Sequence, residues 1–316
     1  MNKKRKPLEL YVHIPFCIRK CAYCDFVSGP GTKAMQKEYE EALLAEIDAA
    51  EETAESEVIS VFFGGGTPSA VDAGMLARVM EKLRSKYVFS EDAEITLEAN
   101  PGTLDAEKLK CYRKSGFNRI SIGCQSVHDE ELKRLGRINT FAEFQESFAL
   151  TRDAGFANIN VDLMSGLPEQ SEEKWEESLR TIAELSPEHI SAYSLIVEPG
   201  TPFAEQKLDL PDEDTEREMY GRTAEILAEY GFFQYEISNY AKPDFACRHN
   251  IGYWKRTDYL GFGPSAASLF GNRRWTNTAD RSLYLKACGA LEKIREDEEI
   301  LSRQDAWKNL CFSAFE

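Results

Sequence analysis

The sequence predicts an α/β fold in which short strands alternate with helices. Short apolar runs typical of buried strands alternate with longer stretches in which apolar residues recur at helical spacing. Strands separated by helices in this way pair in parallel through right-handed crossovers. Six such units follow one another, and six units suit an open, three-quarter (β/α)6 barrel better than a closed barrel of eight strands. We therefore expect a partial barrel.

Each element is predicted from the spacing of its apolar residues and from the residues at its two ends. Thr103 caps one helix, Gly116 and Gly155 close two others, and Pro187 ends a further one. In chain order, the predictions are strand 8–14, helix 33–55, strand 58–63, helix 70–86, strand 93–97, helix 103–116, strand 118–123, helix 140–154, strand 157–163, helix 171–185 and strand 189–197.

The alternation changes after about residue 200. Residues 211–230 predict a helix, and residues 232–237 and 259–270 predict further short strands beside Gly-rich turns. The expected division is therefore a barrel, residues 1–200, and an accessory α/β region, residues 201–316.

Composition narrows the class of protein. The 316-residue chain is 42% hydrophobic, which is compatible with a packed core, and its formal net charge is −16. Because general nucleic-acid binding needs a basic surface, we expect no nucleic-acid partner. Eight cysteines occur without an apolar segment near about 18 residues and without a signal-peptide core before Leu8. We therefore expect a reducing, cytoplasmic location where thiols stay free for metal.

Three cysteines lie within eight residues directly after the first predicted strand: Cys17, Cys21 and Cys24. A structural zinc site usually takes four ligands from paired cysteines far apart in the sequence, and this chain has no second pair. His13 is the residue that would complete a zinc site. Three cysteines can instead hold an iron–sulfur cubane and leave one iron open to a substrate or cofactor. We favour the cluster and keep zinc as the alternative.

Polar residues mark the ends of the following strands, where a parallel barrel collects its chemistry. Residues 64–67 follow the second strand, Glu98 and Asn100 follow the third, Gln125 follows the fourth, and Asp162 lies in the fifth. We expect these residues to face one mouth, onto which the cysteines also open.

The side chains at this mouth have the chemistry to bind a polar cofactor. The glycines allow the backbone to approach a ligand closely, although an ordinary strand-to-helix turn explains them equally well. Glu98 can hold an ammonium group or a pair of ribose hydroxyls. Gln125 and Asp162 can bond hydroxyls, and Arg137 can pair with a carboxylate through two hydrogen bonds.

Several separated motifs identify a family. They are LYVHIPFC at residues 10–17, KCAYCDF at 20–26, FGGGTPS at 63–69, EANPG at 98–102, SIGCQS at 121–126, LGR at 135–137 and DLMSGLP at 162–168. The cysteine spacing is the radical S-adenosylmethionine (SAM) signature. From about residue 8 to residue 284, the chain resembles the oxygen-independent coproporphyrinogen oxidase-like radical SAM proteins.

That resemblance implies a set of cofactors and ligands. Cys17, Cys21 and Cys24 would bind a [4Fe–4S] cluster, with SAM on the open iron and an electron donor as a partner. Whether a second SAM binds, as in the dehydrogenases of the family, stays open. No catalytic residue is assigned. Tyr23 would lie beside the cluster, and the residues expected to line the SAM and substrate mouth are Tyr11, Gly65, Gly66, Thr67, Glu98, Gln125, Arg137 and Asp162.

Two features favour one branch of this family. The coproporphyrinogen III dehydrogenases carry a fourth cysteine where this chain has Phe26, and they have a substantial segment before the cluster. The motif HNIGYW at residues 249–254 instead resembles the HemW-like haem chaperone branch. His249 would then ligate haem iron, with Cys247 as a competing ligand, and Tyr253 or Trp254 would stack on the porphyrin. The alternative is a core histidine beside aromatic packing.

Three functions are consistent with the sequence, and we give them in order of preference. The first is a haem chaperone that binds haem and passes it to recipient haemoproteins, with a possible peripheral membrane encounter at those recipients. The second is an oxygen-independent coproporphyrinogen III dehydrogenase, and the third is a non-enzymatic zinc or structural-thiol protein. SAM cleavage and the oligomeric state stay open. Family members usually continue into a C-terminal winged-helix-like domain, and we expect that this domain is missing after the apolar segment 306–316.

Overall fold

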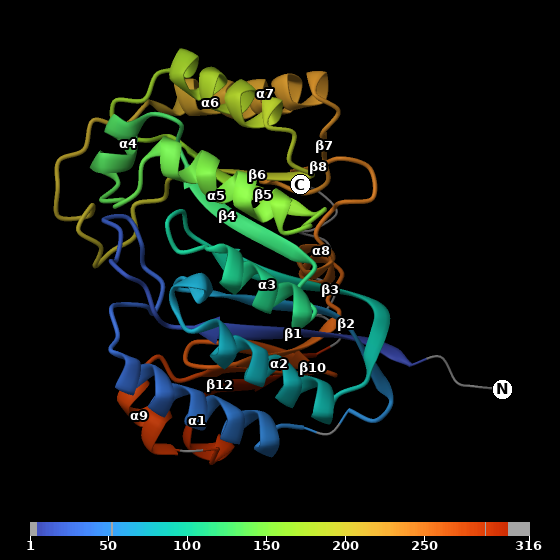
Figure 1. The fold of residues 1–316 in the computed structure, drawn as a ribbon. Coiled ribbons are helices and arrows are strands. Elements are labelled where there is room, and N and C mark those ends of the chain that lie inside the picture. The colour runs from blue at the N-terminus through green and yellow to red at the C-terminus, as the bar shows by residue number, and fades with distance from the viewer. Residues whose placement is uncertain (1–4, 52, 288, 303–316) are drawn as a thin grey trace.

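The chain forms one mixed sheet of 12 strands with helices packed along it (Figure 1). The computed structural model describes residues 5–51, 53–287 and 289–302. The central strands run parallel in chain order, which confirms the predicted α/β fold with its consecutive strand–helix units. These strands are β1 (Lys6–Ile14), β2 (Ser56–Gly65), β3 (Phe89–Ala99), β4 (Arg119–Gln125), β5 (Ile159–Ser165) and β6 (His189–Ser194).

The longer helices begin at side chains that satisfy their first free backbone amides. In each, an Asp, Ser or Thr at the N-cap accepts a hydrogen bond from the amide three residues further on. They follow one another along the sheet in Figure 1. These helices are α1 (Lys33–Ala49), α2 (Ala73–Lys86), α3 (Ala106–Lys114), α5 (Phe141–Asp153), α6 (Glu172–Glu184) and α7 (Glu213–Glu229).

Both edges of the sheet carry strands from the later part of the chain. One edge continues from β1, through a parallel pair and then antiparallel pairs, into β9 (Asp258–Phe262), β10 (Ala267–Phe270), β11 (Arg273–Asn277) and β12 (Arg295–Ile300). The other continues from β6, through antiparallel pairs, into β8 (Asn239–Ala241) and β7 (Phe233–Gln234). The division near residue 200 stays a prediction, and the strands after it extend the same sheet.

Some predicted element bounds are wrong. The helix expected over residues 33–55 ends at Ala49, because the next residue is extended. The strand expected over residues 259–270 is two strands, β9 and β10, joined by a turn in which Gly263 has a φ of 97°. The sequence also gave no sign of the short helices α4 (Asp129–Arg134), α8 (Arg248–Trp254) and α9 (Arg281–Ala287), or of the 3-10 turns η1 (Pro68–Ala70) and η2 (Leu291–Lys293).

The parallel strands are buried on both faces. Phe63 and Ile120, on the side of the sheet that the helices cover, are fully buried in the main apolar core. The opposite, inner side of the same strands carries polar residues that are buried as well, among them Glu9, Arg119 and His189. Parallel sheets with both faces covered are expected to bury both sets of side chains. The inner face is therefore a polar interior rather than a solvated surface.

Two of the short helices pack against elements from the N-terminal part of the chain. The helix α8 contacts β2, and α9 contacts α1. Among the described residues, no helix has the length and apolar character needed to span a bilayer. The apolar segment 306–316, in which a further domain was expected to begin, lies outside the described residues.

Candidate functional site

The cysteine loop leaves β1 at the carboxyl end of the parallel strands and is tied to its neighbours by backbone hydrogen bonds. The Cys17 amide donates to the Gly29 carbonyl (3.0 Å), which closes the loop on itself. The Thr67 amide, just beyond β2, donates to the Phe16 carbonyl (2.7 Å). The Thr67 hydroxyl also lies 3.4 Å from the Cys17 sulfur, to which it donates. The first cysteine is thereby held against the end of β2.

The far side of the loop is fixed by a second, smaller apolar core. The Ala22 amide donates to the Leu135 carbonyl (3.0 Å), and the Phe203 amide donates to the Ala22 carbonyl (3.1 Å). Tyr23 packs against this core, which consists of Leu135, Met164, Leu167, Leu195 and Phe203. The segment between the second and third cysteines is therefore anchored by residues distant in the sequence.

The three cysteines line one cavity of about 140 Å³. All three are free and half-buried. Burial raises the pKa of Cys24, and the neighbouring Cys21 and Cys17 add to that rise. Among the described residues, no three His, Cys, Asp or Glu side chains are grouped as a site for a single metal ion. The same cavity is lined by the predicted mouth residues Tyr23, Gly65, Gly66, Thr67, Glu98, Gln125, Arg137 and Asp162.

Close packing explains the glycines that follow β2. Gly65 has a φ of 104°, and a Cβ atom there would lie 2.5 Å from the His13 ring. A Cβ atom at Gly66 would lie 2.6 Å from the Phe16 carbonyl oxygen. The contact between β1 and β2 thus requires glycine at both positions, with or without a ligand. The Gly65 amide also donates to Glu98 Oε2 (3.2 Å).

Two carboxyl groups at the cavity have raised pKa values. Burial raises the pKa of Glu98 to about 8, and the nearby Asp162 contributes to the rise. Burial also raises the pKa of Asp162, although hydrogen bonding from Asn160 and the charge of Arg119 oppose it. A ligand that brings positive charge or hydroxyl donors would stabilise the ionised form of both. The mouth therefore favours a ligand with an ammonium group or hydroxyls.

A chain of hydrogen bonds joins Arg137 to the first cysteine. Arg137 Nη2 donates to Asn100 Oδ1 (2.9 Å) and to the Gly123 carbonyl. Asn100 Nδ2 in turn donates to Thr67 Oγ1 (2.8 Å), the hydroxyl that contacts Cys17. Arg137 Nε is buried and has no hydrogen-bond partner among the described residues. Because buried donors are normally paired, an anionic ligand group in the cavity would satisfy it.

Asn100, which was expected at the mouth from its place after the third strand, lines this cavity, and so does Tyr193, to which sequence reasoning gave no role. The Tyr193 hydroxyl donates to Gln125 Oε1 (2.8 Å). Tyr193 follows His189 and Ser191 at alternate positions of β6, so its inward direction could have been read from the strand period.

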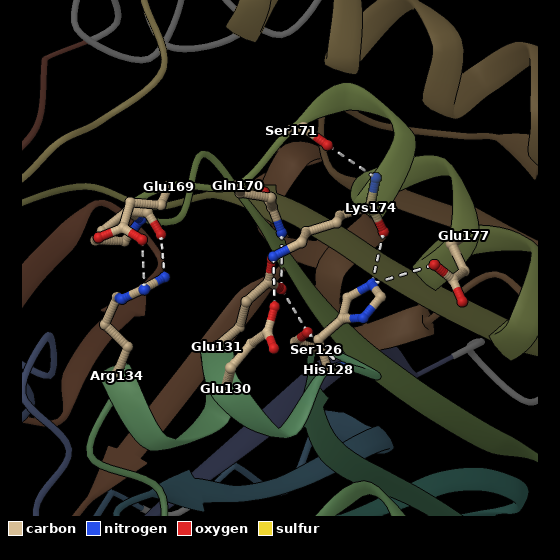
Figure 2. Close-up of polar contacts among 11 residues, drawn as sticks. Ser126, His128, Glu130, Glu131, Arg134, Glu169, Gln170, Ser171, Lys174 and Glu177 are labelled. Carbon is tan, nitrogen blue, oxygen red and sulfur yellow. Dashed lines mark hydrogen bonds and ion pairs between the residues drawn. The ribbon is translucent and has the colours of Figure 1, made fainter.

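A polar cluster around α4 joins this short helix to the segments that follow β4 and β5 (Figure 2). The buried Glu131 carboxylate accepts hydrogen bonds from the Ser126 hydroxyl (2.5 Å) and from Gln170 Nε2 (3.2 Å). Arg134 donates to the Pro168 carbonyl (2.7 Å). These bonds join the ends of β4 and β5 to α4, and the residues after α4 run directly into Leu135–Arg137. The anchor of the cysteine loop is therefore itself fixed.

The remaining two predicted residues, Tyr11 and His249, are not among those that line this cavity. Tyr11 lies deeper inside the barrel, where its hydroxyl is 3.2 Å from His13 Nδ1. Its ring stacks with Phe62 and His249, at centroid distances of 6.4 and 6.5 Å. Tyr11 therefore lies between the two regions and supports His13, the ring under Gly65.

His249 lies at the other end of the barrel, which we call the floor. It belongs to α8, and its side chain is 2% exposed. Its Nδ1 atom is 2.9 Å from the Ser60 hydroxyl, and its Nε2 atom is 3.3 Å from the Tyr253 hydroxyl. Burial, with a smaller effect of Arg119, lowers the pKa of His249 to about 3. The imidazole is therefore neutral at physiological pH.

Two further buried residues complete the floor. The Cys247 thiol donates to Glu94 Oε1 (3.4 Å), and burial raises its pKa to about 12. The fully buried carboxyl of Glu9 lies 4.0 Å from His249 Nδ1, and burial raises its pKa to about 8. A Cβ atom added to Gly252 would lie 2.0 Å from this carboxyl group, so α8 packs directly onto it.

Comparison with known proteins places these residues in a family. The radical SAM superfamily pattern matches residues 11–182. Heme chaperone HemW of Escherichia coli (strain K12) is 42% identical over 265 residues, which cover 83% of this chain and 70% of that protein. Heme chaperone HemW of Bacillus subtilis (strain 168) is 38% identical over 281 residues, covering 87% and 74%.

A solved structure gives the same result at the level of the fold. The coproporphyrinogen III oxidase HemN from Escherichia coli, described as a radical SAM enzyme, superposes with a TM-score of 0.86 at 27% identity. The superposition covers 99% of this chain and 76% of that one.

Proposed function

Because the chain belongs to the radical SAM superfamily and, within it, to the HemW family, we propose that it is a haem chaperone that binds a [4Fe–4S] cluster and SAM and passes haem to haemoproteins. One observation carries this proposal. Three cysteines share a cavity with buried groups of opposite charge, the Glu98 and Asp162 carboxyls and the Arg137 guanidinium. This donor set fits a cluster together with a zwitterionic cofactor.

Cys17, Cys21 and Cys24 are the proposed cluster ligands. When bound, a three-cysteine cluster supplies one open iron for SAM and a route for the electron that SAM cleavage needs. The chain's own contribution is to hold the loop, through Thr67 on one side and Leu135 on the other. Because the ligands must stay as free thiols before assembly, a reducing compartment such as the cytoplasm suits this chain.

The mouth residues have separate roles in holding SAM. Gly65, Gly66 and Thr67 would offer backbone groups to the methionine part. Glu98 would accept from the ammonium group, and Arg137 would pair with the carboxylate through its unpaired Nε. The ribose hydroxyls would bond Gln125 and Asp162, while Tyr23 packs beside the cluster and Tyr11 acts through His13.

Haem would bind away from this mouth, in the region of the HNIGYW motif. The cavity around the cysteines contains the charged groups of Glu98, Asp162 and Arg137 and measures about 140 Å³, whereas the aromatic residues Tyr253 and Trp254 line a separate cavity. A carrier that keeps haem apart from the cluster can use SAM and the cluster to control haem release without acting on the porphyrin. The recipient haemoproteins would meet the chain at this second region.

The first test is anaerobic reconstitution with iron and sulfide, followed by titration with ferric haem. We expect a cluster with broad charge-transfer absorption and haem binding near one per chain. A colourless sample without iron or sulfide would contradict the cluster proposal and return zinc to consideration. A reconstituted chain that takes up no haem would contradict the chaperone proposal alone.

A second function is favoured by the likeness to the coproporphyrinogen III oxidase HemN. Under that alternative, the reconstituted chain would convert coproporphyrinogen III when supplied with SAM and a reductant, and deoxyadenosine would form in step with product. We expect neither, because the position of a fourth cysteine is held by Phe26, a side chain that is 61% exposed beside the cavity. Substrate-dependent product would overturn the assignment.

A further inference from the structure

A row of hydrogen-bonded side chains crosses the interior of the barrel from the mouth to α8. Asn160 and Asp162 on β5 lie in register with His189 and Ser191 on β6, and residues at alternate positions of a strand face the same side. Asn160 is 2% exposed and His189 is 0% exposed. These side chains belong to the enclosed polar interior, and Asp162 is the member of the row that lines the cysteine cavity.

The row is continuous from the mouth to the start of α8. Asn160 Nδ2 donates to Asp162 Oδ1 (2.6 Å), and Asn160 Oδ1 lies 2.5 Å from His189 Nδ1. His189 Nε2 lies 2.7 Å from the Tyr235 hydroxyl, and this hydroxyl accepts from the Cys247 amide (3.2 Å). The loss of any one of these groups therefore interrupts the row.

All of these hydrogen bonds point the same way. The Asn160 carbonyl oxygen can only accept, so His189 Nδ1 carries the proton. Burial and the nearby charge of Arg119 hold the pKa of His189 well below its usual range, so the imidazole is neutral and its Nε2 atom is an acceptor. The Tyr235 hydroxyl therefore donates to His189. From α8 onwards, every donor in the row points toward the mouth.

At its far end, the row reaches a turn that holds both ends of α8. Tyr235 accepts from the amide of Cys247, the N-cap residue of the helix. The next residue, Glu236, accepts from Nε1 of Trp254, the last residue of the helix (3.1 Å). The helix is 7 residues long, and helices this short are not stable without contacts from outside. The attachment of α8 therefore depends on this turn.

We propose that Asn160, His189 and Tyr235 are positioning residues that couple occupancy of the mouth to the attachment of α8. The inference rests on the proposed function, in which Asp162 bonds the ribose hydroxyls of SAM and α8 carries the motif of the haem region. Hydroxyl donors stabilise the ionised form of Asp162. Hydrogen bonds in a row polarise one another, so a full charge at Asp162 strengthens each bond as far as the Cys247 amide. The helix α8 is therefore held more firmly when the mouth is occupied.

The consequence for haem follows from the same helix. A segment that is already fixed loses less conformational entropy when a second ligand binds to it. We therefore expect SAM to tighten haem binding by about tenfold, and haem to tighten SAM binding by the same factor. Emptying the mouth then weakens the hold on haem, which is what a carrier needs when it delivers its cargo.

The first test is amide hydrogen exchange of the reconstituted chain with and without SAM, in the absence of a reductant. In the unchanged chain, SAM should slow exchange in residues 247–254 by about fivefold. Tyr235→Phe removes one hydroxyl of the row and should lose this protection while it still binds SAM. Tyr240→Phe is the matched control, because that buried hydroxyl, in the same hairpin, has no hydrogen-bond partner among the described residues. Equal protection in Tyr235→Phe would overturn the inference.

His189→Phe interrupts the row one step nearer to the mouth and gives an independent check. It keeps an aromatic ring but removes both ring nitrogens, so the protection of residues 247–254 should again be lost. SAM affinity within about threefold of the unchanged chain shows that the mouth of this variant is folded. If the variant binds no SAM, the comparison of Tyr235→Phe with Tyr240→Phe decides alone.

The coupling itself is measured by titration with ferric haem in the presence and absence of SAM. SAM should strengthen haem binding by about tenfold in the unchanged chain and in Tyr240→Phe, and by less than about twofold in Tyr235→Phe. An unchanged factor in Tyr235→Phe would leave the stacked rings of Tyr11 and Phe62 as the connection, and it would overturn the inference.

These outcomes separate the two proposals. A reconstituted chain that binds SAM but no haem would remove the haem-carrying function, and the exchange experiment would still decide the coupling to α8. A chain that binds both ligands, with equal effects of SAM in the unchanged form and in Tyr235→Phe, would keep the proposed function and remove this inference.

Discussion

The mouth and the floor of the barrel both contain buried polar groups, and these groups differ in their hydrogen bonding and their surroundings. At the mouth, Glu98 and Asp162 have raised pKa values, and Arg137 has an unpaired Nε atom in the wall of a cavity. At the floor, His249 and Cys247 are equally buried, and each is bonded to a neighbouring side chain. The Glu9 carboxyl oxygens have no hydrogen-bond partner among the described residues, but they lie under α8 and not among the residues that line the cysteine cavity. Unsatisfied groups beside a cavity indicate a ligand, whereas groups enclosed in the interior indicate packing.

The comparison shows that a buried histidine in a family motif is not for that reason a ligand. His249 belongs to the packed floor, and the residue of its motif that lines a cavity is Tyr253. Tyr11 and Phe62, which stack with His249, are the physical connection between the two ends. Changes at the mouth should therefore alter ligand binding, and changes at the floor should alter stability.

The largest effect is expected at the mouth from Cys21→Ala. Two remaining thiolates rarely retain a cubane, so the variant should lose cluster binding almost completely. The measurement is iron and sulfide content after anaerobic reconstitution, together with the charge-transfer absorption. Cys111→Ala, on α3 and away from the cavity, is the control and should reconstitute normally. Full iron and sulfide in Cys21→Ala would refute the ligand assignment.

The sequence predicted the mouth well because its signals are local. The cysteine spacing, the glycine run and the strand-end residues Glu98, Gln125 and Asp162 each mark the carboxyl end of a strand. Because the strands are parallel, their carboxyl ends meet at a common edge. The three cysteines, two glycines of the run (Gly65 and Gly66) and the three strand-end residues all line the cavity there. Tyr193 was missed because no motif surrounds it, although its alternation with His189 gives its direction.

The floor was poorly predicted because its residues look like surface residues in the sequence. Glu9, between Leu8 and Leu10, has the alternating pattern of a strand with one solvated face, yet it is fully buried. In a barrel both faces of the strand are covered, so alternation cannot separate an inner polar residue from an exposed one. The pairing of Glu9 with α8 depends on a contact more than 200 residues away along the chain, which no local pattern encodes.

The second largest effect is expected in the pH dependence of the free energy of unfolding, through Glu9 in the floor. Burial raises the pKa of Glu9 from 4.5 to about 8, so the folded chain holds a proton that the unfolded chain releases. The stability from this protonated carboxyl is complete below pH 4.5 and is lost as the pH rises through about 8. Glu9→Gln cannot ionise, so it should gain stability over the unchanged chain as the pH rises, reaching roughly 4–5 kcal/mol by pH 9.

Urea unfolding of both cluster-free chains at pH 5, 7 and 9 measures this difference, in which other titrating groups cancel. Parallel stability curves would mean that Glu9 is ionised in the folded chain. The floor would then contain an ion pair with a charged neighbour, and the contrast with the mouth would be weaker.

A smaller effect is expected from the packing of α8 on the floor. A methyl group in Gly252→Ala would press on the Glu9 carboxyl, because the Cβ atom would lie 2.0 Å from it. We expect a loss of about 2 kcal/mol, typical of overpacking. Gly221→Ala, in the open middle of α7, meets nothing within 4 Å and should gain about 0.5–1 kcal/mol. Urea unfolding checks both, and equal effects would show that the floor is loosely packed.

The smallest effect is expected from Arg137 at the mouth, whose Nε atom has no hydrogen-bond partner among the described residues. Lysine at position 137 keeps the charge but removes the planar pair of donors, so Arg137→Lys should weaken SAM binding by about tenfold. The loop should keep its main-chain anchor, because the Leu135 carbonyl that accepts from the Ala22 amide is unchanged. Isothermal titration of the reconstituted protein with SAM measures the change.

Arg134→Lys, three residues earlier and outside the cavity, is the control. If Arg137→Lys bound SAM normally but lost urea stability, the guanidinium would belong to the packing of the mouth through Asn100 and Gly123, and the mouth would resemble the floor in that respect.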